Sequence, residues 1–189
     1  MADVLTDRLL EDHLLCHSKS YLRFQGRLGQ ATAYSTLSAQ LDARHRAEAF
    51  LWLAEKSTGG VRCFNGSRLS GLATGDAMIL DAVGSAEGLE THFHGLQRFP
   101  GGSGLGDYYY QPIRIYRHVQ PGSAVRLQLA FDALILGHLQ GFLPEHGVLI
   151  CGPTFKRIRV QLRVSLESLA TVLTVCGSRP PAATNHRSH

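Results

Sequence analysis

The sequence predicts one α/β (α+β) domain in which a central mixed β-sheet is flanked by helices. Apolar residues recur at helical spacing in the first 56 residues and again over residues 123–141. Between these regions the apolar and polar side chains alternate, which is typical of strands. With 189 residues, 44% of them hydrophobic, the chain can bury one ordinary core. A sheet with helices on its faces accommodates this order of elements most simply.

The N-terminal region is expected to form two helices. The first covers residues 5–24, with Thr6 as its N-cap and Gly26 as its stop signal. The second covers residues 34–56 and ends at a glycine pair. Its apolar positions can share one face, which we expect to pack on the sheet: Leu37, Leu41, Ala47, Phe50, Leu51 and Ala54.

The middle of the chain reads as strands joined by short turns. The runs "LETHFHGLQRF" and "YYYQPIRIYRHV" alternate on either side of a glycine-rich turn and predict a β-hairpin. The turn lacks the lysine and hydroxyl residue of a phosphate-binding loop, so we interpret it as a hairpin connection. The other expected elements are strands at 61–65, 76–83, 146–152 and 155–164, a central helix at 123–142 and a last helix at 165–176. Residues 1–176 are expected to form the domain, and 177–189 a disordered tail.

Composition narrows the class of protein. The net charge is +4, and only three of the 19 basic residues are lysines. Guanidinium groups suit phosphate through their planar fork, so nucleic-acid binding is permitted but not required. No apolar run is long enough to span a bilayer and the N-terminus does not resemble a secretory signal, so a cytoplasmic protein with no membrane partner is expected. The four cysteines are far apart, which favours free, mostly buried thiols over a zinc site.

Two polar patterns carry possible chemistry. His92 and His94 lie two apart on a predicted strand, so they point to the same face and are weak candidates for a metal site. Equally, they are two polar side chains on an exposed strand face. Arg157 and Arg159 also share a strand face, with Lys156 beside them. Together with hairpin arginines and tyrosines they could follow a single nucleic-acid strand, or could form an ordinary solvated surface.

Three segments together resemble a known family. They are "LLEDHLLCHSKSYLRFQGRLG", "HFHGLQRFPGGSGLGDYYYQPIRIYRH" and "VRLQLAFDALILGHLQGFLPEHGVLICG". Across residues 4–165 the chain resembles RecB-like putative nucleases of the PD-(D/E)xK superfamily, related to CRISPR-associated RecB-like exonucleases. The resemblance implies a restriction-endonuclease-like αβββαβ core with an N-terminal helix. It also implies a metal site, in which Mg²⁺ or Mn²⁺ is held by an acid on the second core strand and another on the third, followed by a lysine.

The metal-binding positions are replaced in this chain. The resemblance puts His94 at the first acid, Arg114 at the second and Tyr116 at the lysine, while Glu48 and Gln128 match supporting positions. A guanidinium in a metal pocket repels a cation by a few kcal/mol at ~4 Å. The resemblance therefore implies a catalytically impaired nuclease domain without a cofactor, and only Cys16 would fit an iron–sulfur cluster.

The expected function is binding of DNA or RNA, with single-stranded DNA favoured, in DNA processing, repair or defence against mobile elements. The residues expected to contact phosphate are Arg114, Arg117, Lys156, Arg157 and Arg159. One alternative is a non-catalytic module that binds a protein partner in a larger DNA-processing complex. Another is an active Mg²⁺- or Mn²⁺-dependent nuclease with relocated acids, for which the candidates are Asp76, Asp81, Glu90 and Asp107.

Overall fold

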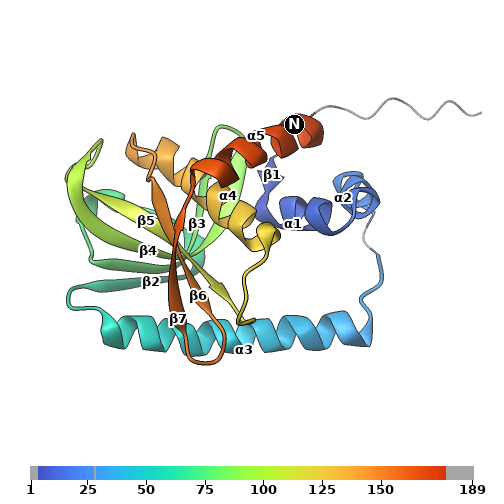
Figure 1. Cartoon of the computed structure of the whole chain (residues 1–189), viewed down its shortest axis with the longest axis horizontal. Helices are drawn as coiled ribbons and strands as arrows, with labels where there is room; N and C mark the ends of the chain where they lie inside the picture. The colour runs from blue at the N-terminus through green and yellow to red at the C-terminus, as the bar shows by residue number, and fades with distance from the viewer. Residues whose placement is uncertain (1–3, 28, 178–189) are drawn as a thin grey trace, which may run out of the picture.

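Helices cover both faces of a seven-stranded mixed sheet in this computed structural model, which describes residues 4–27 and 29–177 (Figure 1). The elements are β1 (Leu5–Thr6), α1 (Asp7–Leu15), α2 (His17–Phe24), α3 (Ala33–Lys56), β2 (Val61–Arg68), a short 3₁₀ turn (Leu72–Thr74), β3 (Met78–Ala86), β4 (Leu89–Ser103), β5 (Gly106–Tyr116), α4 (Ser123–Gln140), β6 (His146–Cys151), β7 (Lys156–Gln161) and α5 (Arg163–Gly177). The long helix α3 runs along one face, and α1, α4 and α5 lie on the other (Figure 1).

The sheet order is β2-β3-β4-β5-β6-β7, and β1 also pairs with β4. β3, β4 and β5 are antiparallel neighbours, whereas β2 is parallel to β3 and β6 is parallel to β5. The sheet is not closed into a barrel, since β2 and β7 end it. The expected mixed α/β fold is confirmed, and α3, β3, β4, β5, α4 and β6 follow the αβββαβ order, with β2 as an additional strand between α3 and β3.

Two apolar cores lie on opposite faces of the sheet. The larger one is built around α4, which is buried on most of its circumference, as its composition predicts. The smaller one lies between α3 and the sheet and includes Ala49, Leu53, Leu80, Ile113 and Ile115. The face of the sheet that carries the larger core is called the α4 side, and the face that carries the smaller core is called the α3 side. The direction of a polar side chain of the sheet is given relative to these two faces.

The expected first helix is two helices, so that prediction is wrong in part. Thr6 does cap α1, accepting a hydrogen bond from the backbone N–H of Leu9 at 3.2 Å. The break comes at Cys16, whose backbone is extended. It turns α2 back so that Lys19 and Arg23 both form ion pairs with the buried Asp12 carboxylate.

The face of α3 that packs on the sheet also differs from the expected one. The buried residues are His45, Ala49 and Leu53, whereas Leu37, Leu41 and Leu51 are exposed. Only the C-terminal half of this 24-residue helix covers the sheet, and its N-terminal half projects past it (Figure 1). A periodicity argument shows which residues share a face, but not how much of the helix has anything beneath it.

Several smaller expectations have clear outcomes. The β4–β5 hairpin is confirmed, and α4 ends at Gly141 in the left-handed conformation, although its N-cap is Gly122 and not Ser123. Cys151 is buried but Cys16 and Cys63 are exposed, so most of the described thiols are not buried. The tail expected at 177–189 falls, from residue 178 on, outside the described residues. Within them, none of the helices has the length and apolar character needed to cross a bilayer.

Candidate functional site

A paired irregularity interrupts the sheet at the centre of β3 and β4. On β3, Ile79 and Ala82 both join the α4-side core although they are three residues apart. On β4, Phe93 and Leu96 do the same. The register is unchanged across this point, so both strands shift their side-chain alternation at the same place. Asp81 absorbs the shift on β3 with a left-handed φ of 57°, a conformation that costs a non-glycine residue about 1–3 kcal/mol.

The irregularity gathers polar side chains on the α3 side. The Nε2 atom of His92 lies 2.7 Å from Oδ1 of Asp81. The rings of His92 and His94 meet edge to face, with centroids 5.9 Å apart. The expectation that these two histidines share a face is therefore confirmed. Within the described residues, no group of three or more His, Cys, Asp or Glu side chains is arranged to hold a metal ion.

His94 lies where β4 and β5 diverge. The pairing of these strands starts at Gly95 and Ile113 and runs outward to the hairpin turn. At the divergence the backbone N–H of Ile115 donates to Nδ1 of His94 at 3.0 Å, so the imidazole replaces a ladder hydrogen bond. Arg46 of α3 lies on the other side of the ring, with Nη1 3.2 Å from Nε2.

The surroundings of His94 favour its neutral form. Burial lowers its pKa well below the ordinary value, and the charges of Arg114 and Arg46 lower it further. A neutral imidazole has one acceptor nitrogen. Since Nδ1 accepts from Ile115, we assign the proton to Nε2, and the approach of Arg46 is then a packing contact between two donors.

Arg114 lies on the opposite face. Its neighbours Ile113 and Ile115 belong to the α3-side core, so its own side chain points toward α4. There it forms a two-pronged ion pair with Asp132, from Nε to Oδ2 and from Nη2 to Oδ1, both at 2.8 Å. Arg114 is 6% exposed and Asp132 is fully buried. The pair is therefore an internal feature of the α4 side.

Two further groups complete this buried cluster. The Thr91 hydroxyl donates to Oδ1 of Asp132 at 2.6 Å, and Oδ2 of Asp7 lies 3.4 Å from Nη2 of Arg114. Burial lowers the pKa of Arg114, but the charges and hydrogen bonds of Asp132 and Asp7 together raise it more, and the net pKa lies above its usual range. Burial raises the pKa of Asp132, with Arg114 and Thr91 opposing the rise. Because a two-pronged contact needs two acceptor oxygens, we assign Asp132 as ionised.

These positions correct two expectations. His94 and Arg114 do not line one pocket, because the sheet separates them. Arg114 is also not a surface group that phosphate could reach, since its guanidinium is buried against Asp132. Its charge is balanced, so it does not repel a cation from an open site in the way the sequence suggested. Instead Arg114 forms an ion pair with Asp132 of α4 and a second, longer one with Asp7 of α1, so it links these two helices.

The remaining family-matched positions are dispersed. Tyr116 is half-buried against the α4-side core. Glu48 is exposed and pairs along α3 with Arg44 at 2.9 Å. Gln128 is half-buried on α4, one helical turn before Asp132 and on the same side of that helix. Of these, only Gln128 shares a helix face with a member of the buried cluster.

Three of the four candidate relocated acids are each held by a different partner. Asp76 pairs with Arg62, Asp81 with His92 and Glu90 with Arg68. Asp107 lies at an exposed position near the start of β5. Since the three paired acids contact three separate partners, the geometry does not bring them together around one ion.

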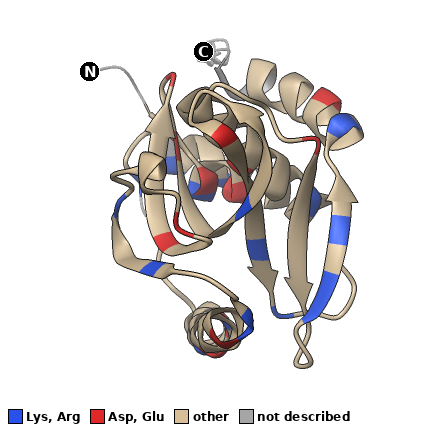
Figure 2. Ribbon diagram, turned by 90° about the vertical axis from the view of Figure 1, so that its left-hand side faces the viewer, with Lys and Arg blue, Asp and Glu red and all other residues tan. Residues whose placement is uncertain are grey.

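The basic residues of β7 divide between the two faces. Arg157 and Arg159 pair with Ile150 and Val148, which belong to the α3-side core, so both arginines point to the α3 side. Lys156 pairs with Cys151 of the other core and points the opposite way. All three are exposed. Figure 2, which looks along α3, shows the basic segments of β7 at the right of the view.

Arg117 lies beyond the end of β5, where it pairs with Asp42 of α3 at 2.8 Å. It is therefore partly neutralised, whereas the two β7 arginines make no ion pair among those found in the described residues. Arg157 donates to Gln97 and Arg159 contacts His146, and neither partner is a carboxylate. The two β7 arginines are therefore the stronger phosphate candidates among the predicted residues, and Lys156, which points to the opposite face, is not part of their surface.

The residues that sequence reasoning missed are those that complete the buried cluster: Asp7, Thr91 and Asp132. Asp132 had a usable signal, since it is the single acid within the apolar run "LAFDALILG". A carboxylate at that point of a buried helix needs a cation. Asp7 and Thr91 carried no such signal.

Comparison of the chain with models of known protein families, and with curated proteins, found no match to either.

Proposed function

We propose that this protein is a RecB-like nuclease-fold domain that binds single-stranded nucleic acid and does not cleave it. The observation that carries the binding is the pair of exposed arginines on the α3-side face of β7. They lie two residues apart on one face of an edge strand, and both side chains are exposed. Nucleic-acid backbones are contacted mainly through phosphate by such side chains.

The loss of cleavage is supported by the buried ion pair. At the position where the resemblance implies a metal-binding acid, Arg114 forms two hydrogen bonds with Asp132. Metal-dependent phosphodiester cleavage needs carboxylate oxygens that are free to hold a divalent ion. Both carboxylate oxygens of Asp132, the fully buried acid of this region, accept hydrogen bonds from Arg114, and Oδ1 also accepts one from Thr91.

The test measures binding and cleavage together. Fluorescence anisotropy with a labelled single-stranded oligonucleotide, titrated at about 50 and 200 mM salt, should give binding that weakens steeply as salt rises. The same oligonucleotide incubated with Mg²⁺ or Mn²⁺ should remain intact. Degradation that depends on metal and is lost in His94→Ala would overturn the non-cleaving part of the proposal.

A protein-binding module is the second candidate, because part of α3 is uncovered. Tyr34, Leu37 and Leu41 recur at helical spacing in the projecting half of α3 and are all exposed. An apolar stripe of this kind suits a helix or groove of another protein. If the folded chain shows no binding to single strands at low salt, this candidate is favoured over nucleic-acid binding.

A further inference from the structure

A small basic pocket lies at the end of α3, on the same side of the sheet as the β7 arginines. Its volume is about 220 Å³. Leu53 and Met78 are its buried members, and its remaining lining is polar or positively charged apart from Ala77. The full lining is Leu53, Lys56, Ser57, Thr58, Ala77, Met78, Gln97, Arg98 and Arg157, which includes three cations and no carboxylate.

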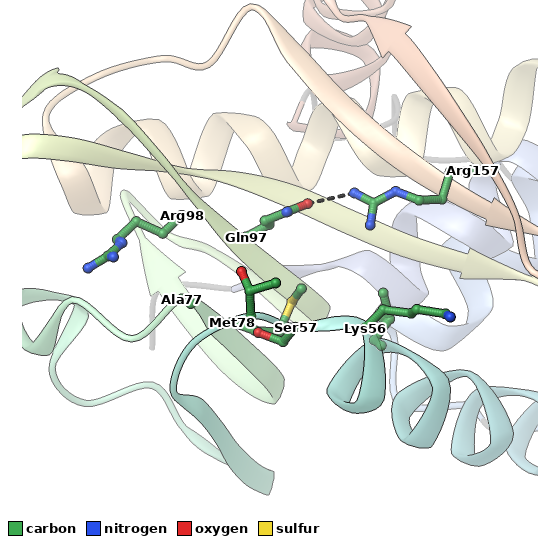
Figure 3. Close-up of a pocket in the computed structure, with 9 residues that line it drawn as sticks. Lys56, Ser57, Ala77, Met78, Gln97, Arg98 and Arg157 are labelled. Carbon is green, nitrogen blue, oxygen red and sulfur yellow. Dashed lines mark hydrogen bonds between the residues drawn. The ribbon is translucent and has the colours of Figure 1, made fainter.

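The pocket holds its cations in different ways. Figure 3 shows Arg157 and Lys56 on one side and Arg98 on the other, with the Arg98 side chain directed away from Gln97. Arg98 donates to the carbonyl of Gly75. Arg157 donates to Oε1 of Gln97 at 2.6 Å, which uses one of its five N–H groups and leaves the Gln97 amide nitrogen as a further donor.

The positive charge of the pocket's side chains exceeds the partial negative charge at the end of α3. The C-terminus of α3 presents about half a negative charge, which disfavours an anion. Lys56 lies in the last turn of the helix and offsets that partial charge. Arg157 on strand β7 then adds a full positive charge. The hydroxyl of Thr58 adds a group that can donate to an oxyanion, whereas the Ser57 hydroxyl donates to the carbonyl of Gly59 at 3.3 Å.

The size and lining of the pocket define the ligand. Sites for drug-sized molecules usually have volumes of about 300–1,000 Å³, so this one suits a single phosphate group better than a whole nucleotide. None of the nine lining residues is aromatic, so the pocket offers no surface on which a base could stack. Recognition here would therefore read the backbone and not the sequence.

We infer that this pocket binds one phosphodiester group of a nucleic-acid strand, through Lys56 and Arg157, with Gln97 as an uncharged donor. The inference rests on the proposed function for the identity of the strand, and on the pocket itself for the anion. A strand that continues from the pocket along β7 would next meet Arg159, which is two residues along and on the same face.

The test compares neighbouring charges on β7. Arg157→Gln and Lys56→Gln each remove one positive charge from the pocket, whereas Lys156→Gln removes the same charge from the adjacent residue on the other face. Since all three residues are exposed, the variants should fold, which circular dichroism melting checks. Each pocket variant should weaken oligonucleotide binding about ten-fold and lower the salt slope by about 0.7, as for one lost phosphate contact. The control should change binding less than about two-fold.

A second readout separates the pocket from the proposed function. In ¹H–¹⁵N spectra, inorganic phosphate should shift the side-chain amide signals of Gln97 in the wild-type protein and should fail to do so in the Arg157→Gln variant. If the wild-type chain binds oligonucleotide but the pocket variants bind as well as the Lys156→Gln control, the pocket inference is overturned and nucleic-acid binding stands. If phosphate shifts Gln97 but no oligonucleotide binds, the anion site is supported and the proposed function fails. If neither is seen, both are overturned.

Discussion

Removing the Asp132 carboxylate tests whether the buried ion pair holds α4 and α1 against the sheet. In Asp132→Leu, Arg114 loses two hydrogen bonds at 2.8 Å and keeps only the 3.4 Å contact with Asp7. A buried charge deprived of its partner costs about 3–5 kcal/mol. Domains of this size are stable by about 5–15 kcal/mol, so the variant should fold but with a large loss.

The magnitude depends on the guanidinium being stranded, and not on the loss of attraction alone. The double variant Arg114→Met with Asp132→Leu removes both charges and fills the space with apolar groups. Replacements of this kind are often neutral or stabilising. The double variant should therefore recover most of the free energy of unfolding lost by the single one, with a coupling of about 3 kcal/mol. Thr91→Val, which removes a hydrogen bond to a charged oxygen, should cost about 1.5–3 kcal/mol.

Urea unfolding followed by circular dichroism at pH 7 measures these free energies. The control is Glu167→Gln on α5, which breaks an exposed pair with Arg163 and should cost at most about 0.5 kcal/mol. A loss below about 1 kcal/mol for Asp132→Leu, with an unchanged denaturant slope, would show that the pair is not buried as described. A double variant as unstable as the two single losses combined would refute the coupling.

Three further results are expected. Because folding lowers the pKa of His94, the unfolded chain binds the proton more readily, so the free energy of unfolding should fall as pH drops below about 6.5. In His94→Gln this pH dependence should weaken by up to ~1.4 kcal/mol per pH unit below that pH, in urea unfolding measured from pH 5 to 8. An unchanged pH dependence would contradict this. Gly84→Ala should cost about 1–3 kcal/mol in thermal unfolding, because its new methyl group would overlap the Phe93 ring, whereas Gly102→Ala meets nothing within 4 Å and serves as its control; equal losses would refute the crowding. Added Mn²⁺ should leave the melting temperature unchanged, and a rise that is lost in His94→Ala would reveal a metal site.

Regular periodicity was enough to predict most of the fold. Alternation identified the hairpin and placed Arg157 with Arg159 on one face, because β7 is regular. The apolar residues around much of the circumference of α4 identified it as the central helix. Such arguments succeed where each residue's direction follows from that of its neighbour.

The arrangement of the candidate site depended on a place where that regularity fails. The pairing of Gly95 with Ile113 would put His94 directly across from Arg114, side by side on one face. In the structure Gly95 and His94 of β4 both face the α3 side, so the alternation of β4 shifts between these two residues. His94 therefore lies on the opposite face of the sheet from Arg114. No residue type in the sequence marks such a shift. In the structure it is accompanied by the left-handed backbone of Asp81 on the neighbouring strand β3.

The open side of β7 has a consequence for how copies of this protein meet. An unpaired strand is a template on which another chain can add its own, and like charges along it keep two copies apart. If a polyanion neutralises the arginines of this strand, it also removes that repulsion. Crowding along one nucleic-acid strand would then bring neutralised sheet edges together, so occupancy and self-association should rise in step.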